Sequence, residues 1–442
     1  MPHPVISLKP SYNSIIRGCP GIPETLPRME FELRIRSNDG KPFIVEKIQV
    51  SLVTTEALAG SGPSFTSKGK LEMETVNYKK NIRVTSKRIV GVDIPLTIAI
   101  PDNIKETNYN KFGQTYTEFR CRVQYVLHRP KGSSNDYVPL SETLSTIVNI
   151  EKYNLIASPQ LFPPLTRKVL SPNKKFEVQY CIKTPCLTME DVLDIELEIL
   201  PNLAKLYGPS YSQKLFNKRL KLKSIVLELK EYLEVHDSRV VSKEHTLVSE
   251  LYPFNNVIGD SGISLSTSLT VSTGIPLFSK FLKSLGEPIS ATISEIQPNL
   301  DDKSIPEVVI LKSKNSKSKE LQTHCSITTR GRLFSISHGL SMKFKISNGK
   351  DFEIKQPLDI SPWSKADINI VEQCIRKELG VAKNALNFYN TFGGIGYNKK
   401  TGITEYPPLH CVIYMPDKET LNDLGVYYTS EHKNAQRIPI IE

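Results

Sequence analysis

The sequence predicts an all-β protein made of two tandem antiparallel β-sandwiches, immunoglobulin-like in type, with a short C-terminal helix. Two observations carry this prediction. Many short segments place an apolar residue at every second position and are separated by turn residues, and the clearest helical spacing comes only after residue 362. A period of two is typical of strands with one buried face, and many such strands between turns indicate sandwiches.

Residues 1–156 are expected to form the first sandwich. In its clearest segment, Met29, Phe31, Leu33 and Ile35 alternate with Arg and Glu, which predicts a half-buried strand. Further strands are expected near residues 5–8, 15–18, 44–52, 92–100, 119–127 and 144–150. In the strand at 119–127, the polar residues that face away from the apolar side are Glu118, Arg120, Arg122 and Gln124. Residues 57–70 are rich in Gly and Ser, which predicts a mobile loop.

Residues 157–362 are expected to form the second sandwich, after a linker at 158–165 that contains three prolines. Alternating segments at 176–182, 193–199 and 263–271 predict strands. The segment 220–235 is ambiguous, since its apolar residues also fit helical spacing. Because the neighbouring segments are all strands, we interpret it as a long strand with a bulge near Ser224.

The strongest strand pattern runs from Leu333 to Ile360. The even positions from 334 to 346 are almost all apolar, whereas the odd positions are mostly Ser or Lys. Asn348-Gly349 then interrupts the pattern with residues that adopt the positive φ of a tight turn. We therefore expect a long antiparallel hairpin, with His338 on its apolar face as a core histidine.

Residues 363–442 are expected to form a C-terminal helix and extension. Ile368, Val371, Ile375 and Leu379 lie on one helical face between Lys365 and Gly380. Gly-rich turns, a short apolar stretch at 409–415 and a polar tail follow. The sequence does not indicate whether this region belongs with the second sandwich.

Composition excludes several classes of function. The formal net charge of +11 favours acidic partners, but the recognition helices and aromatic platforms of nucleic-acid binders are missing. The N-terminus lacks a signal-peptide pattern, and no apolar run reaches the ~20 residues that span a bilayer. The seven cysteines are scattered and without C-x-x-C spacing, as expected of reduced cytosolic thiols.

No catalytic, cofactor or metal site is predicted. The glycines at 393, 394 and 396 lack the spacing and flanking elements of a phosphate loop. The histidines are scattered, and no nucleophile motif is present. We therefore expect a protein that is not an enzyme and needs no cofactor.

One basic row is a candidate binding site. It consists of Lys214, Lys218, Arg219, Lys221 and Lys223. On a strand, residues 219, 221 and 223 share one face, which would bind acidic protein tails or anionic lipid. The alternative is a solvated lysine face that protects a sheet edge from aggregation.

A second candidate is the basic loop at 312–319, which carries Ser313, Ser316 and Ser318. Phosphorylation there would replace positive charge by negative charge and switch the affinity for membrane or cargo. The alternative, which we favour, is a flexible insert without a regulatory role.

Two tandem β-sandwiches, joined by a short proline-bearing linker and without a signal peptide, resemble the arrestin fold. Specific segments are most similar to the fungal α-arrestins, or arrestin-related trafficking adaptors. Residues 29–36 followed by 42–52 resemble the N-domain strand pair whose second strand carries I-x-V-x-L. Residues 336–344 resemble the late C-domain strand in which His or Tyr precedes Leu. Ser361-Pro362-Trp363 and the helix after it are also similar to that group. The resemblance covers about residues 5–360.

This resemblance implies a cytoplasmic adaptor at the plasma membrane or endosomes. It would bind cytosolic tails of transporters or receptors, and in some cases anionic membrane, and link its cargo through a HECT-type ubiquitin ligase to endocytosis. However, the ligase's WW domains bind Pro-Pro-x-Tyr, and the Pro-Pro pairs at 163–164 and 407–408 lack the tyrosine. The alternative is an arrestin-fold scaffold in membrane organisation, retromer association or sporulation that recruits no ligase directly.

Overall fold

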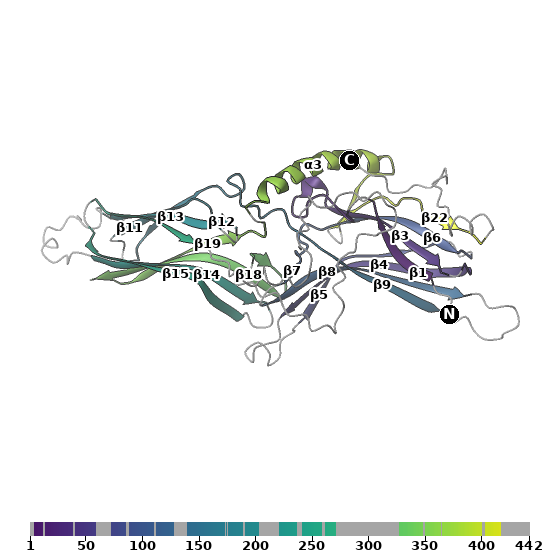
Figure 1. The fold of residues 1–442 in the computed structure, drawn as a ribbon, viewed down its shortest axis with the longest axis horizontal. Helices are drawn as coiled ribbons and strands as arrows, with labels where there is room; N and C mark the ends of the chain where they lie inside the picture. The colour runs from purple at the N-terminus through teal and green to yellow at the C-terminus, as the bar shows by residue number, and fades with distance from the viewer. Residues whose placement is uncertain are drawn as a thin grey trace.

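The computed structural model of the chain is an elongated body in which two β-sandwiches lie end to end (Figure 1). It describes residues 4–416 except for 12–13, 39, 59–71, 85–87, 110–111, 128–138, 173, 175, 189–190, 203–220, 237–240, 259–260, 271–326, 348–349, 364 and 400–402. The candidate residues Lys214, Lys218 and Arg219, and the loop with Ser313, Ser316 and Ser318, lie outside the described residues. The predicted all-β fold of arrestin-like type is confirmed.

The first sandwich packs two sheets face to face. Among the described residues, one sheet has the order β1-β3-β6-β22 with β2 on β3, and the other β5-β4-β8-β7 with β9 on β8. The strands are β1 Pro4–Pro10, β2 Ile16–Arg17, β3 Arg28–Ser37, β4 Phe43–Leu58, β5 Glu72–Ile82, β6 Gly91–Ala99, β7 Asn108–Tyr109, β8 Gly113–Leu127, β9 Leu140–Val148 and β22 Val412–Tyr414, and a short 3-10 helix η1 spans Pro23–Thr25. Apolar side chains from both sheets form one core, in which the rings of Phe31 and Phe119 meet edge to face at 4.9 Å.

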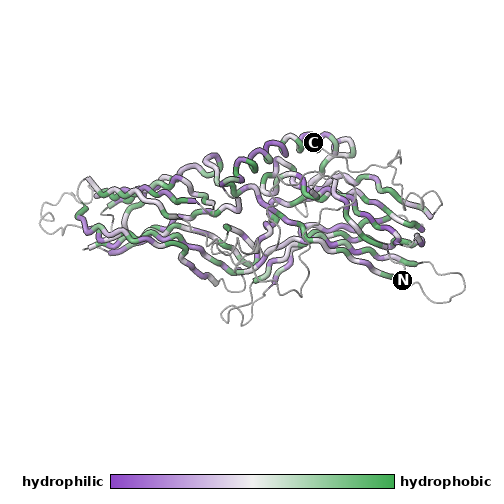
Figure 2. The backbone as a smooth tube through the Cα atoms, in the orientation of Figure 1, coloured by the Kyte–Doolittle hydropathy of each residue, from purple (hydrophilic) through white to green (hydrophobic). Residues whose placement is uncertain are grey.

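The second sandwich repeats this plan. Its described sheets have the orders β10-β11-β13-β16 and β12-β19-β18-β14-β15, with β17 on β18. The strands are β10 Leu165–Leu170, β11 Phe176–Ile182, β12 Cys186–Leu187, β13 Val192–Pro201, β14 Lys221–Val235, β15 Val241–Val257, β16 Ile263–Thr270, β17 Thr329–Arg330, β18 Phe334–Ser347 and β19 Phe352–Ile360. Hydrophobic and hydrophilic residues alternate along the strands of both sandwiches (Figure 2). The alternation produces a second apolar core between the two sheets.

Two sequence predictions for the second sandwich are confirmed in detail. The ambiguous segment is the long strand β14, and its register shifts between Leu222 and Ser224, where a bulge was expected. The hairpin of β18 and β19 pairs antiparallel from His338–Leu358 to Phe344–Phe352. His338 is buried, and its Nδ1 lies 2.9 Å from the hydroxyl of Thr328.

The C-terminal region packs against the first sandwich, above the junction between the two sandwiches (Figure 1). Helix α3 spans Ile368–Asn390, so the predicted end at Gly380 is wrong. Glycine disfavours a helix interior, but Val381, Ala385 and Tyr389 are buried against the first sandwich beyond it. Tertiary packing therefore extends the helix through Gly380. A small hairpin, β20 Gly396–Asn398 with β21 Ile403–Glu405, follows it.

This region corrects the prediction that the strand at 29–35 is only half-buried. Arg28 and Glu30, on the polar side of β3, are 0% and 1% exposed. The Tyr389 hydroxyl donates to Glu30 Oε1 at 3.0 Å, and Arg28 Nε donates to the same oxygen at 2.5 Å. The outer face of β3 is thus covered by α3, from a position 359 residues later in the chain.

Polar and apolar contacts join the two sandwiches. The carboxylate of Glu56, at the end of β4, accepts hydrogen bonds from the backbone amides of Arg332 and Leu333 just before β18. Leu333 belongs to an apolar cluster that also contains Leu58 of β4 and Leu233 of β14. The arrangement fixes the spacing between the sandwiches.

Candidate interaction surface

The outer face of the β5-β4-β8-β9 sheet is the candidate interaction surface of the molecule. Because side chains alternate along a strand, β8 buries Phe119 and Val123 and turns Arg120 and Arg122 outward. Register sets Arg120 opposite Ser51 of β4 and Ser145 of β9, and Arg122 opposite Gln49 and Thr143. These pairings assemble a polar face from strands that are separate in the sequence.

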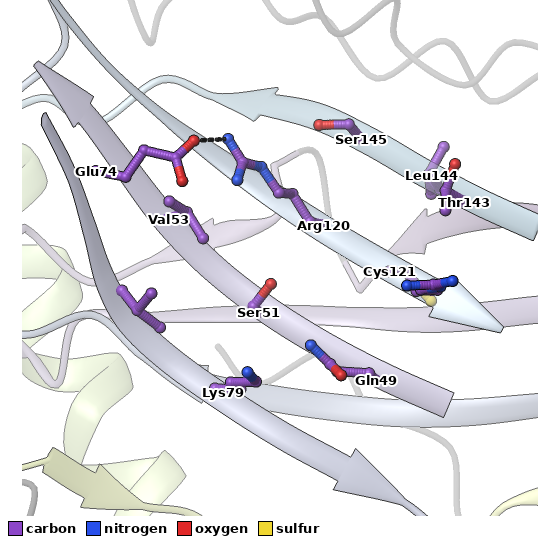
Figure 3. Close-up of a pocket in the computed structure, with 12 residues that line it drawn as sticks. Gln49, Ser51, Val53, Glu74, Lys79, Arg120, Cys121, Thr143, Leu144 and Ser145 are labelled. Atoms are coloured by element: carbon purple, nitrogen blue, oxygen red, sulfur yellow. Dashed lines mark hydrogen bonds and ion pairs between the residues drawn. The ribbon is translucent and has the colours of Figure 1, made fainter. Parts of the chain in front are cut away.

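This face is hollowed, as Figure 3 shows. The hollow has a volume of about 390 Å³. Its lining is contributed by β4, β5, β8 and β9 and consists of Gln49, Ser51, Val53, Glu74, Val76, Lys79, Arg120, Cys121, Arg122, Thr143, Leu144 and Ser145. We call these residues the sheet hollow. Three of these residues are apolar, and Val76 is the exposed one, with 57% of its surface accessible.

Arg120 lies across the sheet hollow in a fixed position. Its Nη2 donates to Glu74 Oε1 at 2.8 Å and to Glu118 Oε2 at 2.7 Å, and its Nε also donates to Glu118 (Figure 3 draws the Glu74 bond). The hydrogen bond to Glu74, followed by those to Glu118, raises the pKa of Arg120 above its ordinary value. The guanidinium is thus held in place with its charge largely balanced.

Two other cations of the sheet hollow have no ion-pair partner among the residues that the structure describes. Arg122 is exposed and donates from Nε to the hydroxyl of Ser141 at 3.1 Å. Lys79 is exposed on β5, next to Ser51 in register. Because Glu74 is paired with Arg120, the charges of Arg122 and Lys79 give this face a positive net charge. It suits an acidic, extended segment of a partner that can also use the hydroxyl and amide groups.

The sheet hollow offers binding groups rather than reactive ones. Its single thiol, Cys121, points into the core and is 1% exposed. Burial raises the pKa of Cys121 to about 12, so the thiol stays protonated at neutral pH and is a poor nucleophile.

The described part of the predicted basic row lies outside the sheet hollow. Of its five residues, the structure describes Lys221 and Lys223, both exposed at the start of β14. Strand β14 runs from there to Val235, which belongs to the cluster joining the sandwiches. Lys221 therefore lies at the far end of the second sandwich, and the described part of the row does not meet the sheet hollow. Its binding role stays a prediction.

Sequence reasoning recognised part of the sheet hollow. Alternation along 119–127 correctly set Arg120 and Arg122 on the outer face. Strand β5, which supplies Glu74 and Lys79, was not predicted, because its exposed and half-exposed residues give no apolar alternation. No helix of the described ranges is long and apolar enough to cross a membrane, and these ranges hold no cluster of three or more His, Cys, Asp or Glu suited to a metal.

Comparison with known proteins identifies a relative. No protein-family model matches the chain. RHO1 GEF localizing protein 1 of the yeast Saccharomyces cerevisiae is 35% identical over an alignment of 502 residues, which covers 100% of this chain and 100% of the yeast protein. End-to-end similarity at this level means that the two chains share one architecture. The chain therefore belongs to the family of RHO1 GEF localizing protein 1.

Proposed function

We propose that this protein is a scaffold without enzymatic activity that binds a RHO1 GEF, a guanine-nucleotide exchange factor, and sets its position in the cell. The observation that carries the proposal is the 35% identity, over the full length of both chains, with a yeast protein named for localizing such a factor. The proposed site of action is the cytoplasmic side of the plasma membrane or of endosomes. The arrestin-like architecture supports the proposal, since it resembles folds that hold other proteins together.

The geometry of the chain suits a scaffold. Glu56 and the apolar cluster at the junction hold the two sandwiches at a fixed spacing. A rigid body loses little conformational entropy when a partner binds to both sandwiches, and two weak contacts then combine into a stronger one. We assign the first contact to the sheet hollow, through Arg122 and Lys79, and its partner to an acidic segment of the exchange factor.

The alternative is the transporter-tail adaptor that the α-arrestin resemblance implies. A basic face would serve acidic tails equally well. However, the two Pro-Pro pairs lack the tyrosine that WW domains bind, so direct recruitment of a ubiquitin ligase is the weaker proposal.

A binding assay with the full-length chain tests the proposal. The purified RHO1 GEF of the same organism is captured on the immobilised protein, and isolated WW domains and an acidic transporter tail are offered separately. Saturable capture of the exchange factor supports the scaffold. Capture of the transporter tail or the WW domains, with none of the exchange factor, would favour the adaptor instead.

Charge-reversal variants then locate the surface. Arg122→Glu with Lys79→Glu alters the sheet hollow, and Lys221→Glu with Lys223→Glu alters the described part of the basic row. Lys383→Glu with Lys399→Glu, at exposed positions of α3 and of the segment after it, is the control with the same change in net charge. We expect only the first pair to weaken capture, by at least tenfold.

A further inference from the structure

One face of helix α3 contacts three consecutive residues, the last residue of β2 and the two residues after it. Glu378 accepts a hydrogen bond from the backbone amide of Gly18 at 2.8 Å and lies 3.6 Å from Nη2 of Arg17. Cys374, one helical turn before Glu378, packs in the same apolar cluster as Cys19. The helix and the turn are therefore held in register at the position of the two thiols.

The two thiols differ in ways that suit them to successive chemical steps. Cys19 is 1% exposed, whereas Cys374 is only partly buried. A hydrogen bond from the Cys19 thiol lowers the pKa of Cys374, with help from Lys377 and Arg17, and outweighs the opposite effects of burial and of Glu378. The same hydrogen bond raises the pKa of Cys19. Cys374 thus ionises first, and the buried thiol donates to it.

We propose that Cys19 and Cys374 are a redox-active pair that closes a reversible disulfide bond between helix α3 and the first sandwich when the protein meets hydrogen peroxide. This site does not depend on the proposed function. Both side chains pack in the same apolar cluster, so a disulfide bond requires only a local approach of the two sulfur atoms.

The chemistry balances with hydrogen peroxide as the oxidant. The Cys374 thiolate attacks one peroxide oxygen, so that an S–O bond forms, the O–O bond breaks and hydroxide leaves. The Cys19 sulfur then attacks the sulfenic sulfur of Cys374, so that the S–S bond forms and the S–O bond breaks. The two thiol protons end on the two departing hydroxides. Two thiols and one peroxide thus yield one disulfide and two waters, and a dithiol reductant reverses the bond.

The bond would alter the attachment of the helix. In the reduced protein, the N-terminal half of α3 is held by reversible contacts such as those of Glu378. In the oxidised protein, opening of this half would require the disulfide to break. Oxidation would therefore stabilise the coverage of the first sandwich by α3.

Peptide mapping of the full-length protein under non-reducing conditions tests the proposal. The reduced protein is treated with hydrogen peroxide, and the remaining thiols are alkylated. We expect a Cys19–Cys374 linked peptide as the main product, loss of two of the seven thiols, and recovery of both with dithiothreitol. Amide exchange in residues 368–380 should become at least fivefold slower. Oxidation of Cys374 to the sulfinic acid without a linked peptide would overturn the proposal.

Matched cysteine variants distinguish the roles of the two thiols from a general loss of folding. Cys19→Ser should leave a sulfenic acid on Cys374 that dimedone traps, and Cys374→Ser should leave Cys19 unoxidised. Cys186→Ser, at a buried thiol outside the pair, and Cys411→Ser, at an exposed one, are controls that should keep the linked peptide. Equal linkage of Cys374 to Cys411 in the wild type would show unselective oxidation and contradict the assignment.

Discussion

Glu56 Oε2 in the first sandwich accepts a hydrogen bond from the backbone amide of Leu333 in the second sandwich, at 2.9 Å. The amide of Arg332 donates to the same carboxylate at 2.9 Å, and Glu56 is 2% exposed. Consecutive amides that converge on a buried anion form a strong, directional contact. This contact is a polar link between the two sandwiches, and it lies outside the apolar core of either sandwich.

Replacing Gly331 by Ala should loosen this junction. A Cβ at this position would lie 2.1 Å from Glu56 Oε1 and 2.1 Å from the carbonyl oxygen of Phe334, so either the backbone or the carboxylate has to move. We expect the free energy of unfolding to fall by about 2 kcal/mol or more, as for other disrupted buried polar contacts. Scanning calorimetry and the radius of gyration in solution would measure it. Gly396→Ala, where the nearest atom is 3.8 Å away, is the control.

Tyr389→Phe should release the C-terminal half of α3. The hydroxyl contacts Glu30 Oε1 at 3.0 Å and Thr97 Oγ1 at 2.8 Å, so its loss leaves two buried groups with fewer partners. The expected cost is about 1–2 kcal/mol, with faster amide exchange in residues 381–390. Exchange unchanged from the wild type would mean that the apolar contacts alone hold the helix. Leu386→Ala, at a position 40% exposed, should have a smaller effect on this exchange.

Gly380→Ala should stabilise the protein. Gly380 lies inside α3, and nothing lies within 4 Å of the position that a Cβ would take. Alanine lowers the conformational entropy of the unfolded chain and favours the helix by about 0.5–1 kcal/mol. The midpoint temperature of thermal unfolding should rise by a few degrees. A downward shift would indicate that the helix needs flexibility at this point.

Glu106 should make the protein less stable as the pH rises. Burial raises the pKa of Glu106 to about 7, whereas in the unfolded chain the carboxyl ionises near its ordinary value of 4.5. Between these two values the folded state keeps a proton that the unfolded state has released. The free energy of unfolding therefore falls through this window, by up to about 3 kcal/mol.

Glu106→Gln isolates this effect. The amide carries no charge at any of these pH values. The stability of the variant relative to the wild type should therefore increase as the pH rises from 4.5 to 7, and the difference should persist at pH 8. Unfolding temperatures measured across this range provide the comparison, with Glu46→Gln at an exposed position as control. Parallel curves for the wild type and Glu106→Gln would disprove a raised pKa.

The sequence predicts strands well where burial is one-sided and less well where distant segments meet. The bulge near Ser224 and the β18–β19 hairpin follow from local alternation. Local alternation does not predict the burial of Arg28 and Glu30, because the ring of Tyr389 that covers them comes from a distant part of the chain. For the same reason the helix prediction ended at Gly380, since the local cost of glycine is visible in the sequence and the packing of Ala385 is not.

The sheet hollow shows the same limit. Alternation assigns Arg120 and Arg122 to an outer face, but only the register of β5, β4, β8 and β9 brings Lys79 and Glu74 beside them. The residues that the sequence did indicate, Lys221 and Lys223, lie at the other end of the molecule. A row of like charges is visible in a sequence, whereas a surface assembled from four strands is not.

The most direct test of the scaffold is the position of the RHO1 GEF in living cells of the source organism. The fluorescently tagged exchange factor is imaged in cells without this protein, and in cells that carry the wild type, the Arg122→Glu/Lys79→Glu variant or the Lys383→Glu/Lys399→Glu control at equal abundance. We expect the exchange factor to lose its sites of concentration without the protein and with the first variant, and to regain them with the wild type and the control. An unchanged distribution in cells that lack the protein would contradict it.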